Sequence, residues 1–475
     1  MIDDIAFGIH GHFYQPYRED PITGQIPTER GAVPFTNWNE LIYHHCYKPN
    51  TDLRNFERIS FNIGPTLFDW MEKNYPETVK EIVKQENHNF AVYGVGNALA
   101  QPYHHTILPL SKREDKVIQI EWGILDFKKR FGHSPSGMWL PETAVDLESL
   151  QIMAENGIEF TVLAPWQADT QHLDVSQPYW VELKNNRKIG VFFYHQELST
   201  KISFEPKSTI NADRFAMEEI IPILKDTTDT EQPKFLLVAS DGELYGHHQP
   251  FRDKFLDHLM NGALTTRTIQ HSFPALWFRQ HPPQKTIKIR EMTSWSCHHG
   301  VARWSTGCDC TPLSVWKKHL REAIDQVAEI VDREYELIMK KYVHDVWSIR
   351  KAYWEVINEE LDFDQFIRKY LNRSISESER VKIQHLLIAQ VERQRMNTSC
   401  GWFFDDFDRI EPQNVVSYAA HAIYWTEIAT QSAFYDTALP FFKKVLSQRT
   451  LVSGDIIFSQ QYHRSKQYFP TQYQI

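Results

Sequence analysis

The sequence contains few cysteines, no long apolar run and no excess of basic residues, and each absence excludes a class of protein. Its 475 residues include five cysteines, too few for a disulfide scaffold in a chain of this size. No apolar run approaches the roughly 18 residues of a membrane-spanning helix. Residues 1–5 lack the basic and apolar regions of a signal peptide. We therefore expect a cytoplasmic protein that binds no membrane.

Basic residues are outnumbered by acidic ones, with 51 Lys and Arg against 61 Asp and Glu and a net charge of −10. Nucleic-acid binding depends on basic residues that neutralise phosphates, so we expect no nucleic-acid partner. The length exceeds that of one ordinary core, which predicts a large barrel with an appendage or two to three domains. Aromatic residues make up 13% of the chain, which raises the question of which rings bind a ligand.

Up to about residue 290, short apolar runs alternate with segments of helical periodicity at 66–74, 112–131 and 147–156. Such runs are typical of strands that helices cover on both faces. Seven units predict a parallel (β/α) barrel short of the usual eight strands, although a doubly wound open sheet has a similar pattern. Residues 184–188 predict a hairpin turn and hence one extra antiparallel strand. The seven runs are 5–9, 59–63, 90–95, 137–140, 160–164, 189–194 and 235–239.

The remainder of the chain is predicted to be helical. Apolar residues from 316 to 342 recur every three or four positions, as on one face of a helix. Ser376 and Glu379 have the spacing of a capping box that opens a helix toward residue 396. We therefore predict a barrel domain over 1–290 and a helical bundle over 291–475 that contributes aromatic loops to the cleft of the barrel.

Several of the predicted strands end in polar residues. The carboxyl ends of parallel strands meet at one rim, where the active sites of α/β proteins lie. Glu142 follows the fourth run and Asp241 follows the seventh. Cleavage of a glycosidic bond needs one carboxylate that attacks the sugar and a protonated one that donates to the leaving oxygen. Glu142 and Asp241 are candidates for this pair, and ordinary caps of two strands are the alternative.

Two histidines follow the first run. His10 and His12 lie on one face of an extended segment, a spacing that suits metal chelation. With Asp241 or His247 they could form the site of a metal-dependent polysaccharide deacetylase or mannosidase-like hydrolase. The other interpretation is that they form hydrogen bonds with sugar hydroxyls beside the catalytic carboxylates.

Four of the five cysteines, Cys297, Cys308, Cys310 and Cys400, lie in segments rich in aromatic residues. Four thiols could close a structural metal site, but the spacing C-x10-C-x-C lacks paired C-x2-C knuckles. We therefore expect them to be buried small side chains. Aromatic faces can also stack on sugar rings or simply fill a core. The tryptophans near strand ends or these loops are Trp139, Trp166, Trp295, Trp304 and Trp402.

Taken together, these segments resemble glycoside hydrolase family 57, which contains α-glucan amylases, 4-α-glucanotransferases, branching enzymes and α-galactosidases. The segment 10–16 is similar to the first family motif and 105–110 to the second. The segment 137–142 resembles the third motif, whose Glu is the nucleophile, and 240–247 resembles the fourth, whose Asp is the general acid/base. The resemblance covers residues 1 to about 300 by ordered motifs and the helical remainder more loosely.

The resemblance implies an incomplete (β/α)7 barrel with a C-terminal helical domain, and a retaining mechanism without a cofactor or metal. It implies that Glu142 forms a glycosyl-enzyme while Asp241 serves as acid and base. The expected substrate is an α-linked oligosaccharide or polysaccharide. A carbohydrate-binding relative that has lost catalysis is a further alternative. The candidate substrate-binding residues are His10, His12, His105, Trp139, Glu243, His247, Trp295, Trp304 and Trp402.

Overall fold

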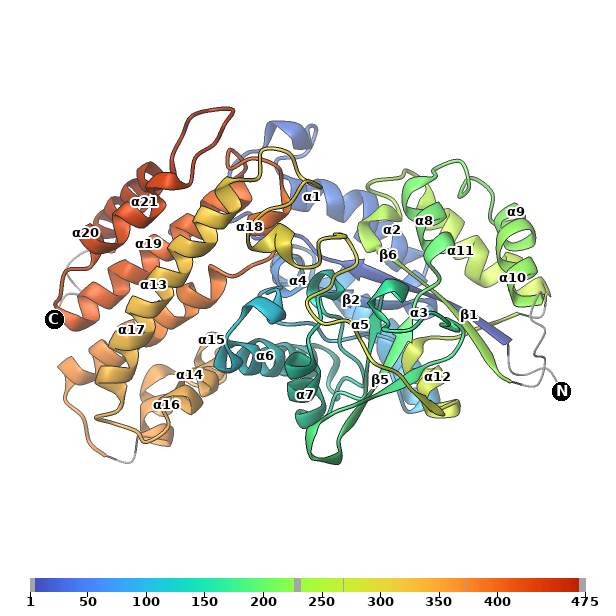
Figure 1. The fold of residues 1–475 in the computed structure, drawn as a ribbon, viewed down its shortest axis with the longest axis horizontal. Helices are drawn as coiled ribbons and strands as arrows, with labels where there is room; N and C mark the ends of the chain where they lie inside the picture. The colour runs from blue at the N-terminus through green and yellow to red at the C-terminus, as the bar shows by residue number, and fades with distance from the viewer. Residues whose placement is uncertain (1–4, 226–231, 268, 372, 470–475) are drawn as a thin grey trace. The chain divides into compact units, whose positions relative to one another are not determined.

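A computed structural model describes residues 5–225, 232–267, 269–371 and 373–469 (Figure 1). The chain divides into two compact units. Two segments of the predicted barrel domain, 18–27 and 104–122, belong to the second unit, an assignment that local sequence patterns do not reveal. The first unit is Met1–Tyr17, Thr28–Tyr103 and Gly123–His298, and the second is Arg18–Pro27, His104–Trp122 and His299–Ile475.

The first unit contains a sheet centred on β1 (Ile5–Phe13). It pairs in parallel with β2 (Ser60–Ile63) on one side and with β6 (Lys234–Asp241) on the other. The short β7 (Gln270–His271) also pairs in parallel with β1. From its second residue to its last, β1 is buried, as expected for a parallel strand covered on both faces.

A second sheet in the same unit has the order β3-β5-β4-β8. The strand β3 (Phe160–Leu163) is parallel to β5 (Lys188–Phe193). The strand β4 (Tyr179–Glu182) is antiparallel to β5, which confirms the extra strand predicted from the turn at 184–188. The short β8 (Lys285–Thr286) pairs in parallel with β4.

Isolated parallel bridges continue the ladder from β2 to β3 through two segments that are not long enough to count as strands. Beyond the end of β5, the backbone N–H of His195 donates to the carbonyl of Leu237 in β6 at 2.7 Å. Parallel segments therefore follow one another in the order β6, β1, β2, 98–100, 137–138, β3 and β5. The bridges join Phe61 to Ala98, Ala100 to Met138, and Gly137 to Phe160.

The strand predicted at 90–95 is wrong. Most of these residues form the end of α5 (Pro76–Tyr93), which Gly94 terminates with a φ of 71°. The apolar side chains here are largely on the surface; Phe90, for example, is 37% exposed. The segment that pairs with β2 begins only at Ala98. An apolar run at an exposed helix end was thus mistaken for a buried strand.

The other helices of the first unit follow the predicted alternation with strands, and those predicted at 66–74 and 147–156 are confirmed as α4 and α7. The helix α6 (Arg113–Phe131), predicted at 112–131, is divided between the units at residue 122. The remaining bounds are α1 (Trp38–Ile42), α2 (Lys48–Asp52), α3 (Asn55–Arg58), α4 (Pro65–Asn74), α7 (Leu147–Glu155), α8 (Gln196–Phe204), α9 (Ala212–Phe215), α10 (Ile221–Lys225), α11 (Arg252–His258) and α12 (Pro274–Gln280).

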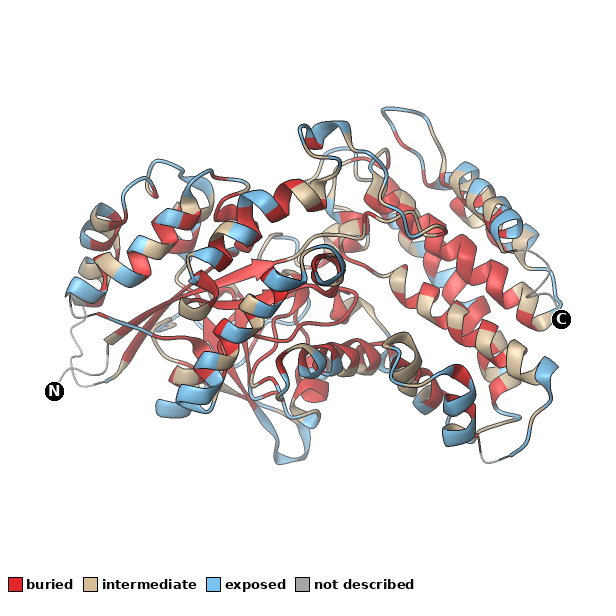
Figure 2. Ribbon diagram, turned by 180° about the vertical axis from the view of Figure 1, so that it is seen from behind, coloured by how far each residue is buried: buried red, intermediate tan, exposed pale blue. Residues whose placement is uncertain are grey.

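The second unit is helical, and α19 lies at its centre because α13, α17 and α21 all pack on it. Figure 2 shows α19 buried along most of its length. The predicted capping box is confirmed at the start of α17. Within the described residues, no helix has both the length and the apolar character needed to cross a membrane. The bounds are α13 (Trp316–Met339), α14 (Val346–Ala352), α15 (Trp354–Ile357), α16 (Phe363–Tyr370), α17 (Glu377–Arg395), α18 (Cys400–Phe403), α19 (Ile410–Thr430), α20 (Tyr435–Ala438) and α21 (Gly454–Tyr468).

Candidate active site

Three polar side chains lie at the same level across β2, β1 and β6. In the parallel register His12 is opposite Asn62 on one side and Asp241 on the other, and His10 is opposite Ser60. Because alternate residues of a strand point to the same face, His10 and His12 point in the same direction. The carboxyl end of the first sheet therefore brings the histidine pair next to Asp241.

The two imidazoles are hydrogen-bonded inside the protein. The Nδ1 of His10 lies 2.9 Å from Ser60 Oγ and its Nε2 lies 3.1 Å from Asn62 Oδ1, while His12 Nδ1 lies 3.2 Å from the same Asn62 oxygen. Burial lowers the pKa of His10 to about 3, helped by the neighbouring His12, and lowers the pKa of His12 to about 4. Both rings are therefore neutral at pH 7, and both nitrogens of His10 already have protein partners.

Trp139 lies beneath the histidines and not on a surface open to sugar. Its ring is 0% exposed, and it stacks on His10 with ring centroids 4.6 Å apart and on His12 at 5.3 Å. Its edge also contacts Trp295, with centroids 5.0 Å apart. The prediction that Trp139 stacks on substrate is therefore corrected: a fully buried ring supports the imidazoles, because no face of it is left for a ligand.

The backbone at Glu142 has an uncommon conformation. Glu142 and Thr143 have φ values of 56° and 48°, in the left-handed region, where each non-glycine residue costs about 1–3 kcal/mol. The side chain of Gln167 holds this turn: it accepts from Thr143 Oγ1 at 2.8 Å, and its Nε2 donates to the Thr143 carbonyl at 2.8 Å and to Thr293 Oγ1 at 3.1 Å. These hydrogen bonds thus fix the backbone of the turn and with it the direction in which the Glu142 side chain points.

The carboxylate of Glu142 accepts hydrogen bonds from Trp295 and Ser296, two consecutive residues far from it in the sequence. Trp295 Nε1 donates to Glu142 Oε2 at 3.1 Å, and Ser296 Oγ donates to the same oxygen at 2.7 Å. The backbone N–H of Trp295 also donates to the Glu142 carbonyl at 3.0 Å. Hydrogen bonds to a charged acceptor are among the stronger ones, so they both orient the carboxylate and stabilise its ionised form. Trp295 was predicted as a sugar-binding residue, whereas its indole N–H contacts Glu142; Ser296 was not predicted, although it is the next residue.

Asp241 ends β6 and is reached by solvent, although protein surrounds its carboxyl group closely. Desolvation raises its pKa to about 7, and the negative charge of Glu142 contributes to the same shift. The two carboxylates therefore act on each other electrostatically. At neutral pH Asp241 exists in both protonation states, which is the condition for a group that must first give and then take a proton.

Glu243 and His247 follow Asp241 in the chain. Glu243 is buried and accepts a hydrogen bond from Tyr47 Oη at 2.9 Å; desolvation raises its pKa to about 8 against this bond, and the charge of Asp241 adds to the rise. His247 is half-buried and has an edge contact with Trp38, with ring centroids 5.9 Å apart. Tyr47 and Trp38 come from the segment between β1 and β2, and no motif in the sequence marked them.

Three of the predicted site residues belong to the second unit. His105 is buried there, and its Nδ1 lies 2.6 Å from Ser399 Oγ. Trp304 and Trp402 are 0% exposed, and Arg321 joins them by donating to the Trp304 carbonyl and lying over the Trp402 ring. The prediction that Trp304 and Trp402 bind substrate is corrected, because rings without exposed surface act as core.

Metal ligation by the histidine pair finds no support in the geometry. Among the described residues, one group of at least three His, Cys, Asp or Glu side chains could hold a metal ion, and it includes neither His10 nor His12. That group lies in the cysteine-rich segment. The prediction that these cysteines are buried holds for Cys297, but it is wrong for Cys310, which is exposed.

Comparisons with known proteins agree with the ordered motifs. The family model described as Glycosyl hydrolase family 57 matches residues 6–290, which is more than half of the chain. A second model, described as Domain of unknown function (DUF3536), matches residues 314–466.

The similar proteins are named as a 4-alpha-glucanotransferase, amylases and branching enzymes. A 4-alpha-glucanotransferase from Thermococcus litoralis is 25% identical over 217 residues, 44% of this chain and 30% of that enzyme. The chain spans about a third of the length of the curated relatives it matches. The exo-type maltose-forming amylase of Pyrococcus sp. ST04 has a TM-score of 0.73 at 14% identity, covering 92% of this chain and 82% of that one. A branching enzyme of Pyrococcus horikoshii has a TM-score of 0.63 at 13% identity, covering 99% and 97%. The structures show a shared fold, and with the match over 6–290 the chain belongs to glycosyl hydrolase family 57.

Proposed function

We propose that the protein is a retaining glycoside hydrolase or transglycosidase that acts on α-linked glucans or oligosaccharides, on an incomplete (β/α)7 barrel joined to a helical bundle. The observation that carries this proposal is the electrostatic pairing of Glu142 with Asp241, in which Asp241 has a pKa of about 7. Two carboxyl groups with different environments can divide the roles of nucleophile and acid. Family membership and the names of the relatives support the choice of α-glucans.

The reaction would proceed in two displacements. In the first, Glu142 attacks the anomeric carbon while protonated Asp241 gives its proton to the leaving oxygen, so that the glycosidic bond breaks and a glycosyl-enzyme forms. In the second, ionised Asp241 takes a proton from water or an acceptor hydroxyl, whose oxygen attacks the same carbon and releases Glu142. Water gives hydrolysis and a sugar hydroxyl gives transfer.

The other residues near the pair would bind and orient the sugar. His10 and His12 are neutral, so a sugar hydroxyl would meet hydrogen-bonding groups without a competing positive charge. His10 is bonded to Ser60 and Asn62 through its two nitrogens, so we assign to it the support of Asn62. His12, which also lies beside Asn62, remains a proposed substrate-binding residue. Glu243 and His247 remain proposed substrate-binding residues of the first unit. Substrate binding by His105, in the second unit, stays a prediction.

The stereochemistry of the products tests this function. The protein is incubated with maltooligosaccharides, and the first reducing ends or transfer products are followed by proton NMR before mutarotation. We expect the α-anomer to appear first, because two inversions at the same carbon retain its configuration. Initial formation of the β-anomer would contradict the double displacement, and release of acetate from acetylated saccharides without glycosidic cleavage would favour the deacetylase alternative.

A further inference from the structure

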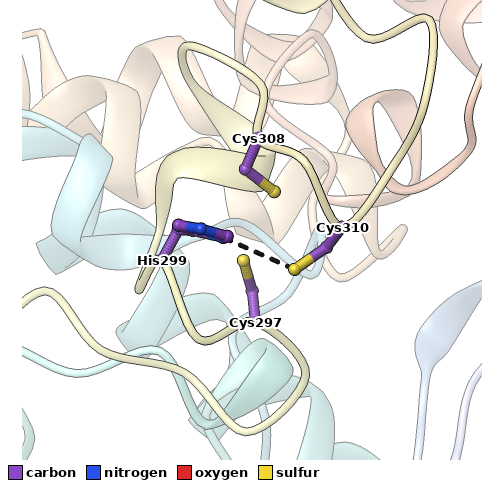
Figure 3. A group of neighbouring side chains, drawn as sticks. All are labelled: Cys297, His299, Cys308 and Cys310. Carbon is purple, nitrogen blue, oxygen red and sulfur yellow. Dashed lines mark hydrogen bonds between the residues drawn. The ribbon is translucent and has the colours of Figure 1, made fainter.

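One loop gathers four side chains that can bind a metal. Cys297, His299, Cys308 and Cys310 each offer one ligand atom, and all four atoms lie within 4.8 Å of one another. Figure 3 shows the three sulfur atoms and the imidazole directed toward a common point. The Sγ of Cys310 lies 3.4 Å from Nδ1 of His299. Since all four residues belong to the continuous segment 297–310, their grouping is local.

The donor set has the composition of a closed zinc site. Zinc in structural sites is tetrahedral with Cys₃His among its usual ligand sets, and its Zn–S bonds of about 2.3 Å place ligand atoms about 3.8 Å apart. Since the four ligand atoms lie within 4.8 Å of one another, each needs to move toward their common centre by less than about 1 Å to reach this geometry. Three thiolates with one imidazole also favour zinc over magnesium or calcium, which prefer oxygen ligands.

The spacing explains why the sequence did not reveal this group. Instead of two C-x2-C knuckles, the ligands come in two pairs separated by a single residue, C-x-H at 297–299 and C-x-C at 308–310. Both pairs lie at turns of the loop, so their convergence on one point depends on the fold of the loop and not on a regular sequence period. Cys400, which the sequence placed with the other three cysteines, is not a member of the group.

The same loop touches the proposed nucleophile. Ser296, which donates to Glu142 at 2.7 Å, is the residue before Cys297, and Trp295, which donates at 3.1 Å, precedes it. Between β8 and α13 the chain has little regular structure, with one short helical turn at Ala302–Trp304. Backbone hydrogen bonds from Met292 to Val145 and from Trp295 to Glu142 hold the residues before the loop. A cross-link that begins at Cys297 would add a restraint directly after Ser296 and reduce the conformational freedom of its side chain.

We propose that Cys297, His299, Cys308 and Cys310 bind one Zn²⁺ ion, and that this ion holds Trp295 and Ser296 against Glu142. The ion is a structural cross-link in this role, because its four ligands come from the protein and leave no open position for substrate. Ser296 and Trp295 are positioning residues that act through Glu142. The second half of the proposal rests on the proposed function of Glu142, whereas the first half does not.

Metal content tests the first half without any assay of activity. The full chain without an affinity tag is incubated with Zn²⁺ and dialysed, and its zinc is measured by mass spectrometry. We expect about one zinc per chain, and loss of that zinc in Cys308→Ser and Cys310→Ser, because removing one thiolate of four opens the site. Cys400→Ser is the matched control and should keep the ion. Co²⁺ in place of zinc should give the thiolate charge-transfer bands of a tetrahedral site.

Zinc well below one per chain in the wild type, or equal zinc in the Cys308→Ser and Cys400→Ser variants, would overturn the site. The second half is tested by a double-mutant cycle between Cys310→Ser and Ser296→Ala. Each single change should lower kcat about tenfold or more, because each removes the charge-assisted hydrogen bond to Glu142. The double variant should lose little beyond the larger single effect. Multiplicative losses would show that the ion does not act through Ser296, and a wild type with zinc but no glycosidase activity would refute the proposed function alone.

Discussion

Replacement of Glu142 with Gln should lower kcat on an activated α-glycoside about 10⁴-fold or more. The amide has nearly the shape of the carboxylate but carries no charge with which to attack the anomeric carbon. The amide oxygen can still accept from Trp295 Nε1 and Ser296 Oγ, which both donate to one oxygen of Glu142 in the structure, so the variant should keep the orientation of the side chain. The loss should appear in kcat more than in KM, because the missing interaction forms only as the reaction proceeds.

A second variant separates chemistry from folding. In Glu142→Ala the site has room for a small anion, and azide should restore turnover by attacking in place of the carboxylate, giving a β-glycosyl azide. The matched control is Glu77→Gln in the exposed first turn of α5, where the side chain pairs with Lys80. It should keep wild-type kcat. Undiminished turnover in Glu142→Gln, or an azide product of α configuration, would reject Glu142 as the nucleophile.

Replacement of Asp241 with Asn should have an effect that depends on the leaving group. On maltooligosaccharides, whose leaving oxygen needs a proton, kcat/KM should fall about 10³-fold. On a glycoside with a good leaving group the first displacement needs little help, so the loss there should be far smaller and glycosyl-enzyme should accumulate. Asp52→Asn, in an exposed surface pair with Lys48, is the control. Equal losses on both kinds of substrate would contradict a role for Asp241 as general acid.

The pKa of Asp241 also predicts the pH dependence of activity and of stability. Because the acid must be protonated in the free enzyme, kcat/KM of the wild type should fall as pH rises through about 7. A carboxyl group whose pKa is raised by folding destabilises the native state once it ionises, so the cost appears above its unfolded pKa and is complete above about 7. Asp241→Asn should therefore raise Tm at pH 8 and leave it nearly unchanged at pH 4. A lower Tm at pH 8 would contradict this sign.

Local patterns were sufficient to predict most of the strand segments. The runs at 5–9, 160–164 and 235–239 are buried in the structure because parallel strands covered on both faces need apolar residues at nearly every position. The run at 90–95 has the same composition, but it follows 14 residues of α5 and is terminated by Gly94. Composition alone does not distinguish these cases, whereas the preceding helical period and the glycine together could have done so.

The strand-end positions of Glu142 and Asp241 were also readable from the sequence, but the residues around them were not. Ser296 lies 154 positions from Glu142 and Tyr47 lies 196 positions from Glu243, so these contacts depend on the tertiary fold. The tryptophans show a related limit. A ring with a sugar-binding face and a ring in a core have the same residue type, and only the burial of Trp139, Trp304 and Trp402 distinguishes them.

The contacts of Glu142 with Trp295 and Ser296 also bear on biosynthesis. During synthesis Glu142 emerges from the ribosome before either donor. About a third of the chain must still be synthesised before its carboxylate can form the two hydrogen bonds that orient it. The family match ends at residue 290, five residues short of Trp295. A fragment cut at that boundary would contain both carboxylates and all the strands found in the described residues, and yet would lack the two hydrogen bonds to Glu142. Under the proposed function, we therefore expect such a fragment to cleave glycosidic bonds more slowly than the full chain.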